Sequence, residues 1–374
     1  MARTKSRRRR VAEARVTAGQ AVDALMAQQW HVWHPLPALH CVPAIVIILA
    51  GGLAIGQPGV ALAAAGGAFS VGFGAFQRLS RWSLAPMALA SVGMAFSTAV
   101  GTGASNFPTI DAVVVGLSAV TLGLGAGLGT GAWWVMLQGS VFLVIAGSIP
   151  GDVHEGLDRA LFVLGGGVIQ CACVLGVRAL APGKFAHLVP PNAVDPPGSW
   201  PEWRAAIRRV LNPSEPAFGY AIVLGLAAGA AVYLVKHIAL PNGYWAPMTV
   251  ILVLRRGARE TLTRGMLRMI GTLTGAGAAT LAMVWLKPSQ EVLVALSAIV
   301  AWAAYSVQWV NYGTFSTCVT AYVAFLFAFE GLPETVVVRH RIIATLTGGA
   351  IALAALGVSR IPSLARSVGW GRRS

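Results

Sequence analysis

The sequence predicts an all-α, polytopic membrane protein with about 12 transmembrane helices, arranged as two parallel six-helix repeats. Of its 374 residues, 56% are apolar and only 11% are charged, against roughly 25% charged residues in an ordinary soluble domain. The apolar residues gather in runs close to the roughly 20 residues that a helix needs to cross ~30 Å of hydrocarbon. A water-soluble fold could not cover so many apolar side chains, which excludes a soluble enzyme, a disordered chain and a disulfide-rich secreted module.

Residues 1–38 are expected to form a basic cytoplasmic segment. The run Arg7–Arg10 is interpreted as an orientation signal that contacts anionic lipid, with nucleic-acid binding as the weaker alternative. Five apolar residues then follow helical spacing: Val22, Leu25, Met26, Trp30 and Trp33. They predict an amphipathic helix that lies either on the inner leaflet or against the cytoplasmic end of the bundle.

Six apolar runs make up the first membrane half, residues 39–180. Their approximate bounds are Leu39–Gly56, Pro58–Phe76, Leu84–Gly101, Ala112–Leu128, Ala132–Ile149 and Arg159–Leu180. The chain contains 44 glycines. In lipid, glycine lets helix backbones approach closely, so these runs are expected to pack as transmembrane helices.

A cytoplasmic linker, residues 181–216, is rich in proline and polar residues and separates the two halves. It carries one apolar face at helical spacing, formed by Trp200, Trp203, Ile207, Val210 and Leu211. Arg204, Arg208 and Arg209 lie off that face. The pattern predicts a second amphipathic helix, again either on the inner leaflet or packed against the bundle.

Six further runs make up the second membrane half, residues 217–359. Their approximate bounds are Ala217–Val235, Tyr244–Leu254, Met266–Leu286, Val292–Gln308, Thr314–Phe329 and Ile342–Ser359. The run Tyr244–Leu254 is short, and we expect it to borrow residues from both flanks. Residues 360–374 are expected to form a basic cytoplasmic tail.

The distribution of positive charge predicts the orientation of the chain. With 12 spans and both termini in the cytoplasm, all but five of the 28 Lys and Arg residues fall on the cytoplasmic side. The five on the outer side are Arg159, Lys236, Lys287, Arg339 and Arg341. This asymmetry follows the positive-inside rule, and an odd number of spans would destroy it. We therefore expect a multi-pass cell-membrane protein with cytoplasmic N- and C-termini.

The two halves resemble each other at the start of their sixth spans. The segment Arg159–Gly167 begins the sixth run and Arg341–Gly349 the twelfth, and each arginine follows an acidic outer loop. Six spans per half give both copies the same orientation. The symmetry axis is then expected to lie along the membrane normal, with the ligand route at the interface between the halves.

Residues 243–280 contain the most specific motif of the chain. It consists of Tyr244, Trp245, Pro247 and Thr249 at the start of a span, a basic loop, then Arg264, Arg268, Gly271, Thr272 and Gly275. This stretch resembles the fusaric acid resistance and aromatic acid exporter family of bacterial membrane proteins. The resemblance extends over about residues 216–358 and is faint over residues 39–180.

That resemblance implies efflux of aromatic or related carboxylic acids. The family is also similar to plant malate channels, which conduct anions. Its members often carry a large cytoplasmic domain between two membrane halves, and only the linker 181–216 stands in that place here.

Arg264 and Arg268 are candidates for substrate binding. Residues four apart lie on one helix face, and Arg268 stands at the head of an apolar run. A guanidinium at membrane depth costs about 2.5–3.5 kcal/mol unless it snorkels or faces water, and it can bind a carboxylate through two N–H groups. The alternative is that both arginines are anchors at the inner interface.

Arg159 and Arg341 break the positive-inside pattern and recur at matched positions. They are expected either to face each other near the outer mouth and attract anions, or to pair locally with Asp158 and Glu334. Tyr244 and Trp245 could stack on an aromatic ligand or belong to the interfacial belt. The same motif adds Thr249 to the substrate-binding candidates.

Other motifs predict packing rather than chemistry. Close helix crossing is expected at Gly271, Thr272, Gly275, Gly348 and Gly349. The four cysteines, Cys41, Cys171, Cys173 and Cys318, lie in apolar runs without the spacing of a metal site. No catalytic motif or phosphate-binding loop occurs in the sequence, so neither an enzyme, a metal site nor a cofactor is expected.

The sequence thus predicts an exporter of small organic anions, with aromatic carboxylic acids as the expected substrates. An inside-negative potential favours anion exit by about 2.3 kcal/mol per 100 mV, so membrane potential or secondary coupling could drive it. The alternatives are an anion channel and a non-transporting envelope scaffold. The expected partners are the lipid bilayer and the anion, with no nucleic acid. The sequence is also compatible with a homo-oligomer.

Overall fold

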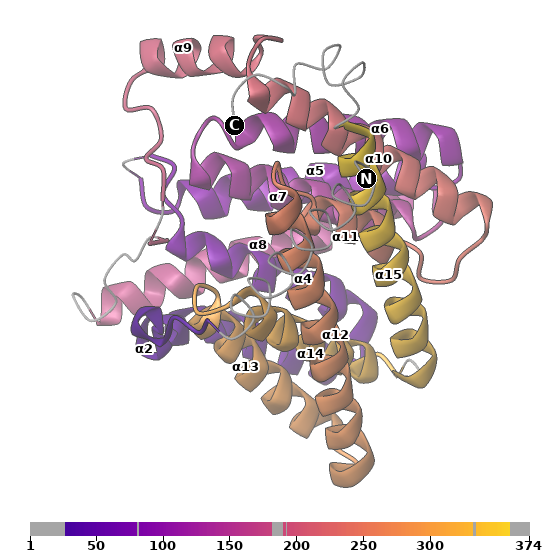
Figure 1. Ribbon diagram of the computed structural model, residues 1–374. Coiled ribbons are helices and arrows are strands. Elements are labelled where there is room, and N and C mark those ends of the chain that lie inside the picture. Colours follow the sequence, from indigo (N-terminus) through magenta and orange to yellow (C-terminus); the bar gives the residue numbers. More distant parts are fainter. Residues whose placement is uncertain (1–26, 81, 182–189, 192, 332–333, 360–374) are drawn as a thin grey trace.

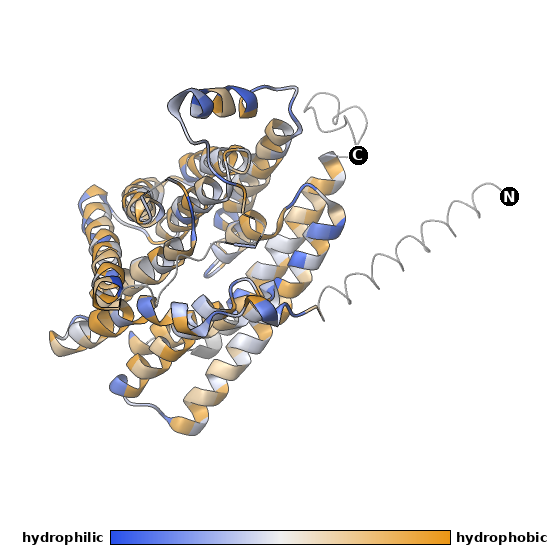
Figure 2. Ribbon diagram, turned by 90° about the vertical axis from the view of Figure 1, so that its left-hand side faces the viewer, coloured by the Kyte–Doolittle hydropathy of each residue, from blue (hydrophilic) through white to orange (hydrophobic). Residues whose placement is uncertain are grey.

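A computed structural model describes residues 27–80, 82–181, 190–191, 193–331 and 334–359, with only the backbone described for 334–339. Within these residues every regular element is a helix. Eleven of the described helical segments are long and apolar enough to cross a membrane. The predicted all-α polytopic membrane class is therefore confirmed. Figure 2 shows hydrophobic residues over most of the helical ribbon.

The first half contains six membrane helices. Their bounds are α3 (Val42–Ala54), α4 (Pro58–Gly72), α5 (Ala85–Ala104), α6 (Pro108–Gly125), α7 (Thr130–Gly147) and α8 (Val153–Leu180). The short α2 (Pro35–Ala38) and the 3-10 turn Leu39–Cys41 lead into α3 and complete a 20-residue span. Proline occupies one of the first two positions of α3 to α6, where its fixed φ favours helix initiation.

The second half follows a linker helix, α9 (Trp200–Val210). Its helices are α10 (Pro216–His237), α11 (Trp245–Val253), α12 (Ala258–Leu286), α13 (Gln290–Val307), α14 (Tyr312–Phe329) and α15 (Glu334–Ser359). In Figure 1, α12 to α15 (orange to yellow) gather on one side of the molecule.

The expected extension of the run Tyr244–Leu254 is wrong. The helix α11 has nine residues, a rise of about 14 Å, which is roughly half of the hydrocarbon thickness. Before it, Asn242 adopts a left-handed conformation with a φ of 53°. After it, Leu254 is extended, and the backbone N–H of Arg255 donates to Thr261 Oγ1 over 2.9 Å. Both ends are thus fixed by local structure, and α11 alone cannot span the membrane.

Helices at the same position in the two halves pack in the same way. The second helix packs on the sixth in each half (α4 on α8, α11 on α15), and the third packs on the fifth and sixth (α5 on α7 and α8, α12 on α14 and α15). Between the halves, the fourth helix of each contacts the first of the other (α6 with α10, α13 with α3). This reciprocity is what a twofold arrangement of two repeats produces. The domain bounds themselves stay a prediction.

The glycines that follow the two matched arginines have equivalent surroundings. A methyl group on Gly166 would overlap the carbonyl oxygen of Ala64 in α4, and one on Gly348 would overlap that of Ala246 in α11. Arg159 precedes Gly166 by seven residues, as Arg341 precedes Gly348. The sequence match between the sixth and twelfth spans therefore corresponds to one packing position.

The α6–α10 junction joins the halves through a close backbone contact. A methyl group on Gly225 would approach the carbonyl oxygen of Gly116 to 2.7 Å. At one end of this crossing, Lys236 Nζ lies 2.6 Å from Asp111 Oδ2 and also donates to the carbonyl of Ser105 over 2.7 Å. Both side chains are largely buried.

The second junction uses aromatic side chains as hydrogen-bond donors. In the second half, Tyr305 Oη donates to the carbonyl of Phe69 over 2.9 Å and Tyr322 Oη to that of Ala65 over 3.2 Å. Both phenols are fully buried against α4. Since a buried hydroxyl needs a partner, these bonds fix how α13 and α14 lie on the first half.

The two predicted amphipathic segments have different outcomes. In the N-terminal one, Val22, Leu25 and Met26 lie outside the described residues, and only a 3-10 turn, Trp30–Val32, forms before the exposed Trp33. The linker segment does form a helix, α9, at the edge of the molecule in Figure 1.

The apolar residues of α9 divide between two environments. Ala206, Val210 and Trp203 pack against Leu128 and Ala132 near the α6–α7 turn. Three others are exposed: Trp200, Ile207 and Leu211. The helix thus packs on the bundle, as one of the two alternatives predicted, while its other apolar residues remain uncovered.

Candidate anion-binding site

Arg341 lies inside the second half, between α11, α14 and α15. Its side chain is 3% exposed. The guanidinium Nη2 donates to Thr320 Oγ1 over 3.1 Å, and the guanidinium carbon lies 3.7 Å from the ring centroid of Trp245. Burial of a charge is costly, and the π-face of an indole is the aromatic surface that stabilises a cation best.

Arg268, on α12, is the second buried guanidinium of this region. It is 4% exposed, and its positive charge acts on Arg341. The Nε atoms of Arg268 and Arg341 are both buried without a hydrogen-bond partner in the described part of the chain. Two buried guanidiniums on the adjacent helices α12 and α15 thus each keep an N–H donor unused.

No carboxylate neutralises this pair among the described side chains. The ion pairs found there are Arg78–Asp195, His154–Asp158, Arg159–Glu155 and Lys236–Asp111. The side chain of Glu334, considered as a partner for Arg341, lies outside the described residues. In a site without acidic side chains, the N–H groups of arginine can donate hydrogen bonds to a bound carboxylate or another anion.

The aromatic pair of the motif lies beside Arg341. The rings of Tyr244 and Trp245 are 4.8 Å apart, and the charge of Arg341 acts on Tyr244. Trp245 is 4% exposed, whereas belt residues face lipid headgroups. The structure therefore places this tryptophan in the protein interior, in contact with a candidate arginine.

Thr249 lies one turn further along α11. It is buried, and its Oγ1 donates to the carbonyl of Trp245 over 2.7 Å. Its Cβ also lies against Gly348 of α15. The hydroxyl is therefore already bonded within α11, and the Cβ of Thr249 takes part in the close contact between α11 and α15.

Close glycine contacts hold the surrounding helices together. Methyl groups on Gly271 and Gly275 would overlap the carbonyls of Gly313 and Thr317 in α14, and Thr272 between them is fully buried. Gly348 makes the equivalent contact with α11. The prediction for Gly349 is wrong, because a methyl group there would meet no atom within 4 Å. One residue further along a helix is about 100° around its axis, so Gly349 faces away.

Arg264 belongs to a neighbouring cluster. Its guanidinium carbon lies 4.4 Å from the ring centroid of Tyr312, and the charge of Arg255 acts on it. Arg255 and Arg256 in turn lie 5.6 Å above the rings of Trp133 and Tyr220. This second group of arginines surrounds the turn between α11 and α12.

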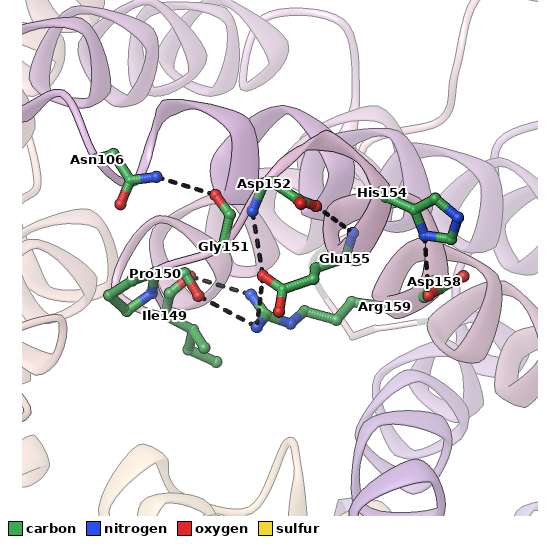
Figure 3. A network of polar contacts seen from close by, with 9 residues as sticks. All are labelled: Asn106, Ile149, Pro150, Gly151, Asp152, His154, Glu155, Asp158 and Arg159. Carbon is green, nitrogen blue, oxygen red and sulfur yellow. Dashed lines mark hydrogen bonds and ion pairs between the residues drawn. The ribbon is translucent and has the colours of Figure 1, made fainter.

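Arg159 is not part of either cluster (Figure 3). Its guanidinium donates to the carbonyls of Ile149 and Pro150 over 3.1 and 3.2 Å, just beyond the end of α7. It also lies 3.9 Å from Glu155, whereas Asp158 pairs with His154 over 3.3 Å. Local pairing was therefore the better alternative, although the partner is Glu155 rather than Asp158. The described contacts of Arg159 do not bring it to Arg341.

The buried site is built from α11, α12, α14 and α15, all within the second half. The expectation of a ligand route at the interface between the halves does not fit this arrangement. Thr320 was missed because an isolated threonine in an apolar run carries no signal. Tyr312 was missed because its neighbour Arg264 is 48 positions away in the sequence. The described residues contain no group of three or more His, Cys, Asp or Glu that could hold a metal ion.

Comparisons with known proteins agree with this placement in the second half. Residues 221–355 match a family model described as fusaric acid resistance protein-like. Over 154 residues, or 40% of the chain, the sequence is 30% identical to inner membrane protein YccS of Escherichia coli (strain K12). The match covers 21% of that relative, so the chain spans about a fifth of its length. No solved structure matches.

The matched residues include α11, α12 and α14 of the buried site and α15 as far as residue 355. They also contain the motif of residues 243–280, which carries the resemblance to this family. Over residues 221–355, the second membrane half of this chain is accordingly similar to fusaric acid resistance-like membrane proteins.

Proposed function

We propose that the protein exports small organic anions, and aromatic carboxylic acids in particular, across the cell membrane. One observation carries the proposal: Arg268 and Arg341, on the adjacent helices α12 and α15, are both buried without a carboxylate partner among the described side chains. Burying two positive charges without a counter-charge costs free energy, and buried charges of this kind are typical of functional sites in membrane proteins. A carboxylate that enters between the two guanidiniums would accept their free N–H groups and cancel the like-charge repulsion.

The aromatic part of the proposal rests on Tyr244 and Trp245. Trp245 already holds the guanidinium of Arg341 over its ring. Tyr244 lies next to it and is only partly buried. An aromatic substrate ring could therefore stack on Tyr244 while its carboxylate binds Arg341.

The membrane potential is the proposed driving force, with secondary coupling as the alternative. In the described helices Asp111, a buried carboxylate, is already paired with Lys236. Proton-coupled carriers usually keep a titratable acid inside the bundle, and no acidic residue of this chain lies near the middle of a predicted span. Exit of a monovalent anion from an inside-negative cell gains about 2.3 kcal/mol per 100 mV without any coupling ion.

The proposed location is the inner or plasma membrane, with both termini in the cytoplasm. This orientation requires a twelfth crossing around α11, in which the non-helical residues on both flanks complete the path that the nine-residue helix begins. Support comes from the apolar helices, from the positive-inside distribution and from the matched relative, which is named as an inner membrane protein. We assign the chain no catalytic role.

An anion channel is the second candidate. The tight α6–α10 junction favours it, because a channel does not require the two halves to move past each other. A carrier shows saturation and counterflow, whereas a channel gives unitary currents in a planar bilayer. An envelope scaffold would give no substrate-dependent flux at all.

The test is a panel of radiolabelled carboxylates in reconstituted vesicles, with an imposed potential and no pH gradient. Arg268→Gln and Arg341→Gln are expected to abolish flux while membrane insertion is retained. Arg259→Gln is the matched control, because Arg259 is an exposed arginine on the same helix as Arg268. Wild-type flux from both buried variants would refute the proposal.

A further inference from the structure

We propose that the turn between α11 and α12 forms a second anion site, which holds the carboxylate before it reaches Arg268. This inference rests on the proposed function. It adds a step in which the anion first binds to named residues at the entrance of the path. The site consists of Arg255, Arg264 and the rings beneath them, Trp133 and Tyr312.

Arg264 has the features of a binding group rather than of a surface anchor. An anchor at the interface points its guanidinium to headgroups and water. Here the guanidinium lies over the ring of Tyr312, and its Nε is buried without a hydrogen-bond partner. As at Arg341, an aromatic face stabilises the charge and leaves N–H groups for an acceptor.

Arg255 is fixed in position by the structure of the turn. Its Nη1 donates to the carbonyl of Leu254 over 2.9 Å, and that carbonyl also accepts from Tyr220 Oη over 3.1 Å. The backbone N–H of Arg255 donates to Thr261 Oγ1. A guanidinium held in this way loses little conformational freedom when it binds a ligand.

Charge compensation is absent here as well. Neither Arg255 nor Arg264 lies within ion-pair distance of a carboxylate in the described residues. The turn therefore shares two features with the deep site: its two arginines have no carboxylate partner in the described part of the chain, and a guanidinium lies over an aromatic ring. At the turn both arginines lie over a ring, whereas in the deep site this contact is found for Arg341.

The two sites are connected along α12. Arg264 and Arg268 are four residues apart, so they share one helix face at a rise of about 6 Å. Arg341 lies on α15, which packs against α12. Conduction through several weak sites in series lets an ion enter favourably and still leave, which a single strong site would prevent.

The phosphate of a lipid headgroup offers the same chemistry as a carboxylate. We assign the site to the transported carboxylate because the Arg264 guanidinium is turned inward over Tyr312, with its Nε shielded from the surface. The exposed arginines of the turn, Arg256 and Arg259, remain available to headgroups.

The experiment measures the KM and Vmax for radiolabelled benzoate in two kinds of proteoliposome, one of phosphatidylcholine alone and one containing phosphatidylglycerol. The variants are Arg264→Gln, Arg255→Gln and Arg264→Lys, with Arg259→Gln as the exposed control. Size-exclusion profiles in detergent check that each variant is folded.

We expect Arg264→Gln and Arg255→Gln to raise the KM by about tenfold in both lipids, with Vmax within about twofold of the wild type. Arg264→Lys should fall between, because an ammonium keeps the charge but loses the planar stack on Tyr312. Arg259→Gln should leave both constants unchanged.

Two results would overturn the inference. An unchanged KM in Arg264→Gln, combined with loss of flux in Arg268→Gln, would remove the entry site and leave the proposed function intact. A change seen only with phosphatidylglycerol would assign the arginines to lipid headgroups. Full flux in both Arg268→Gln and Arg341→Gln is the separate outcome that rejects the proposed function itself.

Discussion

Arg341 and Trp245 form a cation–π pair across the α11–α15 contact, with 3.7 Å between the guanidinium carbon and the centroid of the indole ring. A buried guanidinium normally has a carboxylate partner, and here an uncharged ring stabilises it. An aromatic partner keeps the net positive charge of the site, whereas a carboxylate would cancel it. The pair therefore gives the first prediction.

Replacement of Trp245 should separate charge stabilisation from side-chain volume. In Trp245→Leu, Arg341 loses an interaction worth about 2 kcal/mol when desolvated, so anion flux and thermal stability should both fall. Trp245→Phe keeps a weaker π-face and should retain intermediate flux. Vesicle flux and thermal unfolding in detergent measure the two effects. Equal flux in the Leu and Phe variants would show that the ring face is irrelevant to transport.

Removal of one partner of the Asp111–Lys236 pair should be costly. Lys236→Met leaves a buried carboxylate unpaired, and breaking a buried ion pair typically costs about 3–5 kcal/mol. The double variant Asp111→Asn, Lys236→Met removes both charges and should recover most of that loss. Thermal unfolding of the two variants checks this. A double variant no more stable than Lys236→Met would contradict the account.

Two adjacent glycines of α15 provide a matched test of helix packing. In Gly348→Ala the added methyl group would overlap the carbonyl oxygen of Ala246, and overpacking of this kind costs about 1–3 kcal/mol. In Gly349→Ala the methyl group meets nothing within 4 Å. We expect only Gly348→Ala to lower the melting temperature and the flux. A similar loss in both variants would indicate that helix composition, and not contact, is responsible.

Arg159 is expected to have a structural role. Arg159→Gln removes two hydrogen bonds to the carbonyls of Ile149 and Pro150, which should cost on the order of 1 kcal/mol at this partly exposed position. The expected signature is a small decrease in melting temperature with an unaltered KM for benzoate. A large increase in KM would instead indicate that Arg159 takes part in anion transport.

The spans themselves could be predicted from the sequence, because hydropathy and proline positions are local signals. Pro58 and Pro108 begin α4 and α6 as the pattern predicts. The length of α11 could not be predicted in the same way. Its ends depend on the left-handed Asn242 and on the bond between Arg255 and Thr261, which hydropathy does not reveal.

The site was predicted in part. Arg341 and Trp245 were candidates, and the structure brings these two into contact, but the hydrogen bond of Arg341 to Thr320 depends on tertiary packing alone. The pairing of Arg159 with Arg341 was inferred from matched repeat positions. That inference failed because matched positions do not guarantee matched neighbours: Arg159 reaches the carbonyls that follow α7, whereas Arg341 reaches the middle of α14.

The reciprocal contacts between the halves have a consequence for assembly. Gly116 and Gly123 of α6 lie against α10, and the carbonyls of Phe69 and Ala65 accept hydrogen bonds from the tyrosines of α13 and α14. A chain cut within residues 182–189 would therefore leave two fragments with complementary unsatisfied surfaces. Co-expressed as separate polypeptides, the fragments should recombine in the bilayer and restore anion flux, whereas either fragment alone should be degraded.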